Sequence, residues 1–302
     1  MAEIMYCVFM DVLGYKARVM NTSKTPDEIE QELKDIQTNI AVQFHFLVNE
    51  INRFYNNSPP IFIRSFSDSI YFECKTIEPL IIICHNVYNY VFGFFKNLPT
   101  TIEITPLLRC GIAKDWTTQF HDIAEIVYHK DGLNPIGLGV VKAYETSEKS
   151  GFSGMRIILS PEVFADLQCK KAKSEYFECY CKRLTVWNIP TNYLFKHLVR
   201  NREGKNVNYF ELLWSYNSFE SGDFSHIDVL KKLESTFKGE AIKHSMATAQ
   251  LFYDSLLLTM WNRPKDERFA EQSSKLKQLI KSDCLLLLNR FFSKLINFRL
   301  CF

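Results

Sequence analysis

Two aspartates stand where a metal-binding pair is expected. Asp11 follows the apolar run of residues 4–10, the pattern of a buried strand, and Asp68 lies at the polar tip of residues 61–73, which predict a hairpin. If the strand and the hairpin are neighbours in one sheet, both carboxylates reach the same edge. Hard cations such as Mn²⁺ and Mg²⁺ prefer oxygen ligands and often take few of them from protein. The alternative is that Asp11 caps a helix and Asp68 is a turn residue.

The residues after Asp11 are candidates for a phosphate contact. Val12, Leu13 and Gly14 follow the strand, and backbone N–H groups at the start of a helix can face phosphate. Two divalent cations can lower the pKa of a hydroxyl nucleophile and neutralise a triphosphate leaving group. The carboxylate pair therefore predicts a site for divalent cations, which could act on a phosphate-bearing substrate.

The remaining pattern predicts the elements that position these residues. We expect helices over 27–55 and 79–97, a strand over 105–114, a Gly-rich turn and helix over 134–149, a strand over 155–160, a short helix from Pro161, and strands over 176–189 and 207–215. The order β-α-β-β-α-β predicts an α+β fold of the ferredoxin-like or palm type. The pattern is helical from about residue 217, so we expect one domain over 1–216 and a C-terminal helical region over 217–302.

Composition restricts the classes of function. The chain has 302 residues, 47% hydrophobic and 23% charged, which is typical of globular protein. A formal net charge of +2 gives no basic field for nucleic acid. The nine cysteines are scattered and the N-terminal apolar run follows no basic segment, so we expect a protein of the reducing cytosol without a signal peptide. Charged residues interrupt the apolar tail, so stable membrane insertion is not expected.

Four segments, in order, resemble the class III adenylate and guanylate cyclases. They are VFMDVLGY around Asp11, RSFSDSIY around Asp68, LLRCGIAKD around Arg109, and GLGVVKAYETSEKSG before a strand and Ser-Pro. The resemblance covers roughly residues 5–215 and implies a class III cyclase domain. It implies Asp11, Val12 and Asp68 as ligands of two Mn²⁺ or Mg²⁺ ions per site, and Arg109 on the triphosphate, which suits a guanidinium fork.

The departures from this family concern the transition state and the base. Val141 and Glu145 stand where purine cyclases carry Asn and Arg. Lys142, a candidate catalytic residue, and Tyr144 lie nearby, and the alternative for both is the solvent-facing side of a helix. Arg64 and Asn134 stand at the base-reading positions.

These two residues bear on the choice of base. An Arg donor with an amide could read the edge of a pyrimidine, and the alternative for Arg64 is an ion pair on a strand face. A smaller base leaves room for an aromatic side chain, for which the candidates are Tyr15, Tyr55, Phe62 and Phe66, although any Phe here could be core. Leu13, Gly14 and Tyr15 complete the expected substrate contacts.

With these substitutions the chain resembles the bacterial Pycsar pyrimidine cyclases. That resemblance implies a homodimer with two composite sites, which converts UTP or CTP to the 3′,5′-cyclic nucleotide and pyrophosphate during phage infection. The product would be read by a separate effector. The residues do not decide between UTP and CTP. The alternatives are a purine cyclase, a catalytically silent nucleotide sensor on the same fold, and a palm-type nucleotidyltransferase, which would need a basic groove.

Overall fold

The structure is a computed structural model of the chain. It describes residues 2–15, 19–20, 22–54, 61–66, 68–94, 107–121, 133–148, 153–169, 194–200, 206–215, 227–228, 241–262 and 267–279. The chain divides into two compact units, one formed by residues 1–94 and 106–214 and the other by 95–105 and 215–302. The expected boundary between 216 and 217 falls outside the described residues and stays a prediction.

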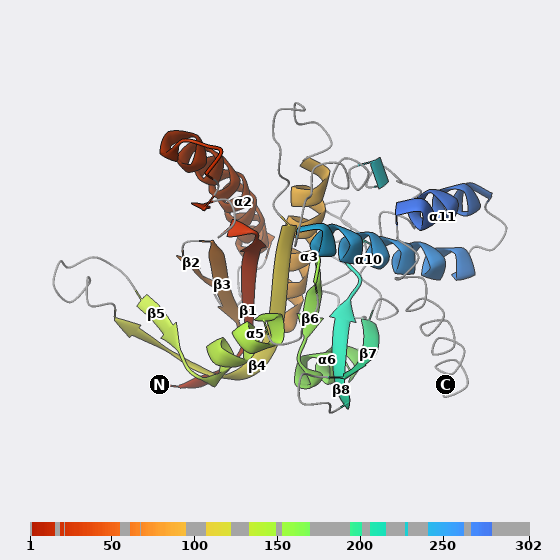
Figure 1. The fold of residues 1–302 in the computed structure, drawn as a ribbon. Helices are drawn as coiled ribbons and strands as arrows, with labels where there is room; N and C mark the ends of the chain where they lie inside the picture. The colour runs from red at the N-terminus through yellow and green to blue at the C-terminus, as the bar shows by residue number, and fades with distance from the viewer. Residues whose placement is uncertain are drawn as a thin grey trace. The chain divides into compact units, whose positions relative to one another are not determined.

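The first unit is built on one sheet. Its strands are β1 (Glu3–Leu13), β2 (Phe62–Phe66), β3 (Ser69–Cys74), β4 (Leu107–His121), β5 (Leu133–Ile136), β6 (Ile157–Leu159), β7 (Leu194–Arg200) and β8 (Asn206–Leu212). They lie in the order β2-β3-β1-β4-β6-β8-β7 (Figure 1), and only the β4–β6 pair is parallel among the described strands. The neighbours β2, β3, β1 and β4 have the ferredoxin-like arrangement, so the predicted α+β class is confirmed.

Helices cover both faces of this sheet. Helix α2 (Pro26–Phe54) and helix α3 (Ile77–Phe94) follow β1 and β3 in the chain, which confirms the predicted β-α-β-β-α-β order. The rings of Phe44 on α2 and Phe72 on β3 meet edge to face at 5.2 Å. Helix α5 (Leu138–Glu148) contacts β1 and β4, and helix α6 (Pro161–Cys169) follows β6 (Figure 1).

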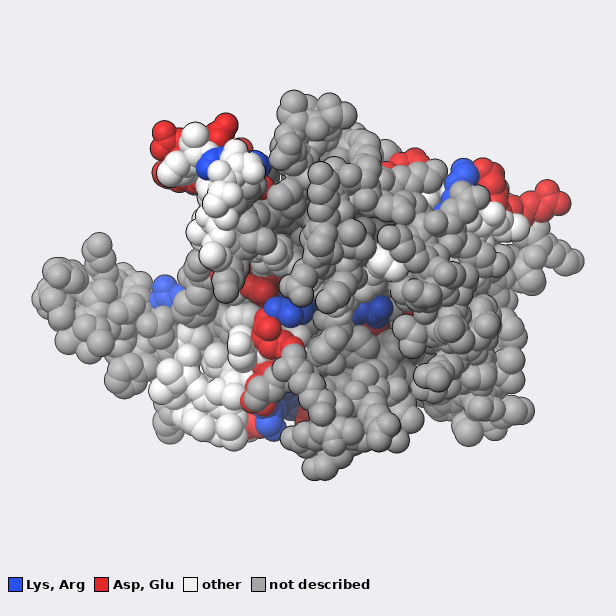
Figure 2. Space-filling model, in the orientation of Figure 1, with Lys and Arg blue, Asp and Glu red and all other residues white. Residues whose placement is uncertain are grey.

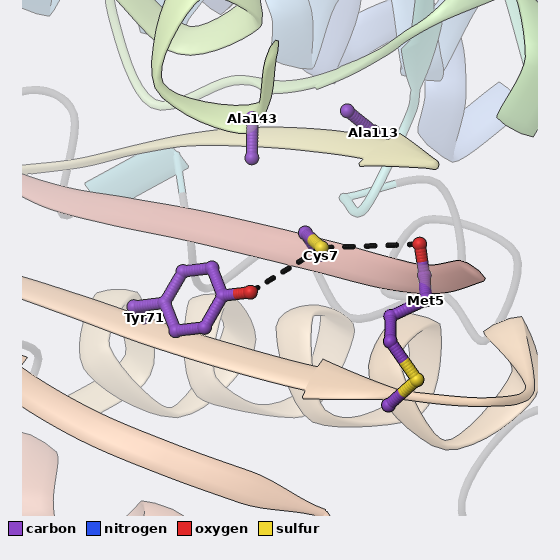
Figure 3. Packing of buried hydrophobic residues seen from close by; sticks show 5 residues of the cluster. All are labelled: Met5, Cys7, Tyr71, Ala113 and Ala143. Carbon is purple, nitrogen blue, oxygen red and sulfur yellow. Dashed lines mark hydrogen bonds between the residues drawn. The ribbon is translucent and has the colours of Figure 1, made fainter. Parts of the chain in front are cut away.

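The α5-covered face holds a buried cluster that joins three strands to the helix. Met5 and Cys7 come from β1, Tyr71 from β3, Ala113 from β4 and Ala143 from α5 (Figure 3). The Tyr71 hydroxyl lies 3.3 Å from Cys7 Sγ, and the Cys7 thiol donates to the Met5 carbonyl oxygen at 3.8 Å. Small side chains at the two alanine positions allow the helix to approach the sheet closely.

Gly111 on β4 shows how close this approach is. A Cβ atom there would lie 2.3 Å from the carbonyl oxygen of Ala143 and 2.4 Å from the backbone nitrogen of Ser147. Backbone atoms cannot move aside as a flexible side chain can. The second half of α5 therefore packs directly against β4, two residues from Arg109 on that strand.

Several boundaries differ from those expected. Strand β1 runs to Leu13 rather than ending before Asp11, and β4 extends to His121. The last residues of β4, Thr118–His121, pair with β5 in a two-stranded arm where a turn was expected (Figure 1). Strand β7 was not predicted, and the strand expected over 176–189 lies outside the described residues.

The second unit contains two described helices, α10 (Ala241–Asn262) and α11 (Glu267–Leu279), which contact each other. Leu251, Phe252 and Leu256 of α10 are fully buried. In the described part of the chain no helix has the length and hydropathy needed to cross a bilayer.

Candidate functional site

The structure brings Asp11 and Asp68 to the same edge of the sheet. Asp11 near the end of β1 is paired in register with Ser69, the first residue of β3. The backbone N–H of Val12 donates to the carbonyl oxygen of Asp68 at 3.0 Å. The two aspartates are therefore joined by neighbouring strands although 57 positions separate them in the chain (68 minus 11).

Asp11 is held by two side chains. The Ser69 hydroxyl donates to Oδ1 at 3.0 Å, and Nη2 of Arg109 donates to Oδ2 at 3.1 Å. Burial raises the pKa of Asp11 above its usual value, and the nearby charge of Asp68 adds to the increase, whereas the Ser69 hydrogen bond and the Arg109 charge oppose it. The net direction is upward, as expected for two adjacent carboxylates that a bound cation would neutralise.

Arg109 connects the aspartate pair to α5. It lies opposite Asp11 in the β1–β4 register, and its Nη2 also contacts Oε1 of Glu148 at the end of α5. Its Nε is buried and has no hydrogen-bond partner among the described residues. A buried donor without a partner is costly, and this Nε would reach a phosphate oxygen only after the guanidinium moves, because the atom is closed to solvent.

The residues that follow Asp11 differ from expectation in one respect. The N–H of Val12 was expected to face phosphate, but it is hydrogen-bonded to Asp68, because β1 continues through Val12 and Leu13 and keeps both in the sheet. Gly14 then ends the strand with φ at +81°, and a Cβ atom there would meet no atom within 4 Å. Tyr15 beside it is half-buried.

The other predicted site residues lie elsewhere on the chain. Asn134 on β5 is paired in register with Phe120, and Arg109 with Asp11, so roughly 35 Å of strand β4 separates the two positions at about 3.3 Å per residue. The Asn134 side chain lies outside the described part of the structure. In a single copy of the chain, Asn134 is not at the aspartate end.

Lys142 and Arg64 contact residues other than the two aspartates. Lys142 Nζ lies 2.5 Å from Oδ2 of Asp115, and both side chains are partly exposed. Arg64 on β2 is paired in register with Tyr71, and its guanidinium carbon lies 5.5 Å from the centre of the Phe62 ring.

The structure describes some of the predicted aromatic and α5 residues and not others. Tyr144 meets the ring of Phe9 edge to face at 5.3 Å, while Val141 is exposed. Tyr55 and the side chain of Phe66 lie outside the described residues.

Sequence reasoning missed Ser69 and Glu148. Ser69 could have been found, because it follows Asp68 directly and starts the strand that pairs with β1. Glu148 gives no signal in the sequence, because only the packing of α5 on β4 brings it to Arg109.

The donor set fits hard divalent cations. Asp11 and Asp68 offer carboxylate oxygens, and no group of three or more His, Cys, Asp and Glu residues in the described ranges could hold a metal. Two carboxylates with the remaining positions left to water and phosphate match Mg²⁺ or Mn²⁺ rather than a closed structural zinc site. Asp11 and Asp68 are the residues whose side chains would hold the ions, and Val12, the third ligand that the resemblance implies, would contribute its backbone carbonyl oxygen.

Among solved structures, the chain is similar to several nucleotide cyclases. The adenylyl cyclase CyaB from P. aeruginosa is 10% identical over 70% of this chain and 94% of that one, with a TM-score of 0.45. The guanylate cyclase domain of RhGC from Catenaria anguillulae, in complex with GTP, is 10% identical over 70% and 97%, with a TM-score of 0.42. A bacterial light-regulated adenylyl cyclase is 8% identical over 78% and 100%, with a TM-score of 0.46.

No protein-family model matches the chain, and neither does any curated protein. With identities of 8 to 10% and scores this low, the similarity to solved structures decides nothing about the reaction. The residues of the chain itself have to carry that conclusion.

Proposed function

We propose that the protein is a nucleotide cyclase that converts UTP or CTP to the 3′,5′-cyclic nucleotide and pyrophosphate with two Mn²⁺ or Mg²⁺ ions. One observation carries the proposal: Asp11, Asp68 and Arg109 come from three separate segments and meet at one edge of the sheet. Two carboxylates suit the cations and a guanidinium suits the triphosphate.

In the proposed reaction the 3′-oxygen bonds to the α-phosphorus, the bond from that phosphorus to the bridging oxygen breaks, and pyrophosphate leaves. Bound ions would lower the pKa of the 3′-hydroxyl and offset the charge of the leaving group. Ser69 keeps the Asp11 carboxylate oriented through its hydrogen bond. The guanidinium of Arg109 would contact a triphosphate oxygen, and the hydroxyl proton would pass to solvent or to a phosphate oxygen.

The distance between predicted site residues supports a homodimer with composite sites. The Asp11 end of β4 and the Asn134 pairing lie at opposite ends of that strand, so one chain by itself does not bring the cation site and the base-reading residue together. Apolar side chains are exposed on and near α5, namely Trp116, Ile136, Leu138, Val141 and Tyr144. In Figure 2 an uncharged patch of the described surface lies beside a band of Asp, Glu, Lys and Arg side chains, and an interface between two copies combines an apolar centre with a polar rim.

The preference for a pyrimidine rests on Arg64 and Asn134. A guanidinium donor and an amide that both donates and accepts can match the oxygens and ring nitrogen of a pyrimidine edge. The product would act as a second messenger in antiphage defence, read by a separate effector in the cytosol. No contact with nucleic acid or membrane is part of this proposal.

The test is a product assay. The purified full chain is incubated with each of the four nucleoside triphosphates and Mn²⁺, and the products are identified by mass spectrometry. We expect cyclic UMP or cyclic CMP with release of pyrophosphate. Cyclic AMP or cyclic GMP as the sole product would show a purine cyclase and reject the pyrimidine assignment.

A second candidate is a catalytically silent nucleotide sensor on the same fold. Val141 and Glu145 occupy the positions where the purine enzymes carry transition-state groups, and loss of such groups costs several kcal/mol of barrier. This candidate predicts that the chain binds a triphosphate without forming product. Binding by calorimetry, combined with no product in the same assay, would select it over the cyclase.

A further inference from the structure

We propose that Glu148 is a positioning residue that gives Arg109 a second carboxylate partner and thereby keeps Asp11 available to a divalent cation. The inference rests on the proposed function of the Asp11 and Asp68 site. Glu148 would contact neither the substrate nor the ions, and it would act through Arg109.

The first observation is a shared donor. Nη2 of Arg109 contacts both Oδ2 of Asp11, at 3.1 Å, and Oε1 of Glu148. The side chains are only partly accessible, with 16% of Arg109, 16% of Asp11 and 29% of Glu148 exposed. Solvent therefore screens these contacts less than it would on an open surface. The guanidinium of Arg109 lies between two carboxylates that compete for it.

The second observation is the rigidity of this arrangement. Because Gly111 has no side chain, the α5 backbone at Ala143 and Ser147 lies so close to β4 that a single methyl group would not fit between them. Ser147 directly precedes Glu148, and Gly111 is two residues from Arg109 on the same strand. The close backbone packing of α5 on β4 thus fixes the position of the end of α5, and with it Glu148, relative to Arg109.

The third observation is the position of Glu148 in its helix. It is the last residue of α5, and no basic residue occupies the last turn. A carboxylate is unfavourable there, because the C-terminal end of the helix dipole is negative. The negative charge of Glu148 does not stabilise α5 itself. The favourable interaction of this carboxylate is the one with Arg109.

These observations predict how the site takes up a cation. A guanidinium paired with Asp11 alone would compete with any ion for that carboxylate. Glu148 gives Arg109 a second partner, so Arg109 can leave Oδ2 of Asp11 without becoming an unpaired, half-buried charge. Removing Glu148 should therefore weaken cation binding, by about tenfold, which is the lower end of the effect of residues that support metal ligands.

The experiment measures Mn²⁺ binding to the full chain without nucleotide, from the electron paramagnetic resonance signal of free Mn²⁺. We expect Glu148→Gln and Glu148→Ala both to weaken binding about tenfold with unchanged circular dichroism. The matched control is Glu30→Gln, which removes an exposed carboxylate on α2 that pairs with Lys34 one turn further along the helix, and it should leave the Kd unchanged.

Coupling to Arg109 separates positioning from a simple charge effect. In an Arg109→Ala background, Glu148→Gln should change the Mn²⁺ Kd by less than about twofold, because the residue through which it acts is gone. A tenfold loss that persists in this background would overturn the inference, and so would unchanged binding in both Glu148 variants. If the wild-type chain itself neither binds Mn²⁺ nor forms any cyclic nucleotide, the proposed function fails instead.

Discussion

Asp11 and Arg109 lie opposite each other on β1 and β4, and Nη2 of Arg109 is 3.1 Å from Oδ2 of Asp11. Paired residues on adjacent antiparallel strands have Cβ atoms about 5 Å apart, so the strand register alone puts these two charges in contact. One of them suits a cation and the other a triphosphate. The site thus places opposite charges next to each other before any substrate is involved.

Replacing either aspartate should remove activity while leaving the fold intact. We expect Asp68→Asn and Asp11→Asn each to lower the rate of cyclic nucleotide formation at least a hundredfold, about 3 kcal/mol of barrier, because an amide binds divalent cations poorly. Product formation by mass spectrometry measures the effect. Asp35→Asn, on the exposed side of α2, is the control, and full activity of Asp68→Asn would rule out the two-ion mechanism.

Exchanging Arg109 for lysine should be damaging although the charge is kept. A lysine has a single nitrogen and cannot replace both the Nη2 contacts and the buried Nε donor. We expect Arg109→Lys to lower kcat/KM for the triphosphate about tenfold or more, which corresponds to at least about 1.4 kcal/mol. Lys34→Arg on α2, which is exposed, should not change kcat/KM, and an Arg109→Lys variant with wild-type kinetics would contradict the assigned role.

A methyl group at position 111 should destabilise the first unit. The added Cβ would overlap backbone atoms of Ala143 and Ser147, so we expect Gly111→Ala to lower the free energy of unfolding by about 3 kcal/mol. Urea denaturation measures it. Gly14→Ala is the comparison, since its Cβ meets nothing within 4 Å and only the positive φ opposes it, at a cost of about 1 kcal/mol. Equal effects of the two variants would argue against close packing of α5 on β4.

Acid should destabilise the protein through His85. This residue on α3 is 2% exposed, and burial lowers its pKa from 6.5 to about 4. The unfolded chain takes up the proton first, so stability is lost as the pH falls from about 6.5 towards 4, by about 3 kcal/mol in total. Urea unfolding at several pH values should show a shallower acid slope for His85→Gln than for wild type. His45→Gln, at an exposed position on α2, should keep the wild-type slope.

Much of the first unit follows from local patterns. An apolar run ending at Asp11, a helical period over 27–55 and a hairpin around Asp68 predict three elements that the structure contains, with ends shifted by a few residues. The shift matters at Val12, whose N–H is used by the sheet rather than left for phosphate. Ends of elements are poorly determined by sequence because pairing with a neighbouring strand can extend them.

The sequence by itself determined the order β-α-β-β-α-β and placed Asp11 at a strand end and Asp68 at a hairpin tip, because the alternation of strand residues and the short hairpin leave few ways to bury the apolar faces. The pairing of β1 with β3, which brings the two aspartates together, is a property of the tertiary structure. Only the tertiary structure decided the contact of Arg109 with Asp11 and Glu148, the arm that carries Asn134 away from the aspartates, and the pairing of β7 with β8. These contacts depend on strand register and on the packing of α5 against Gly111. Both are set by contacts between residues far apart in the chain, which no local pattern records.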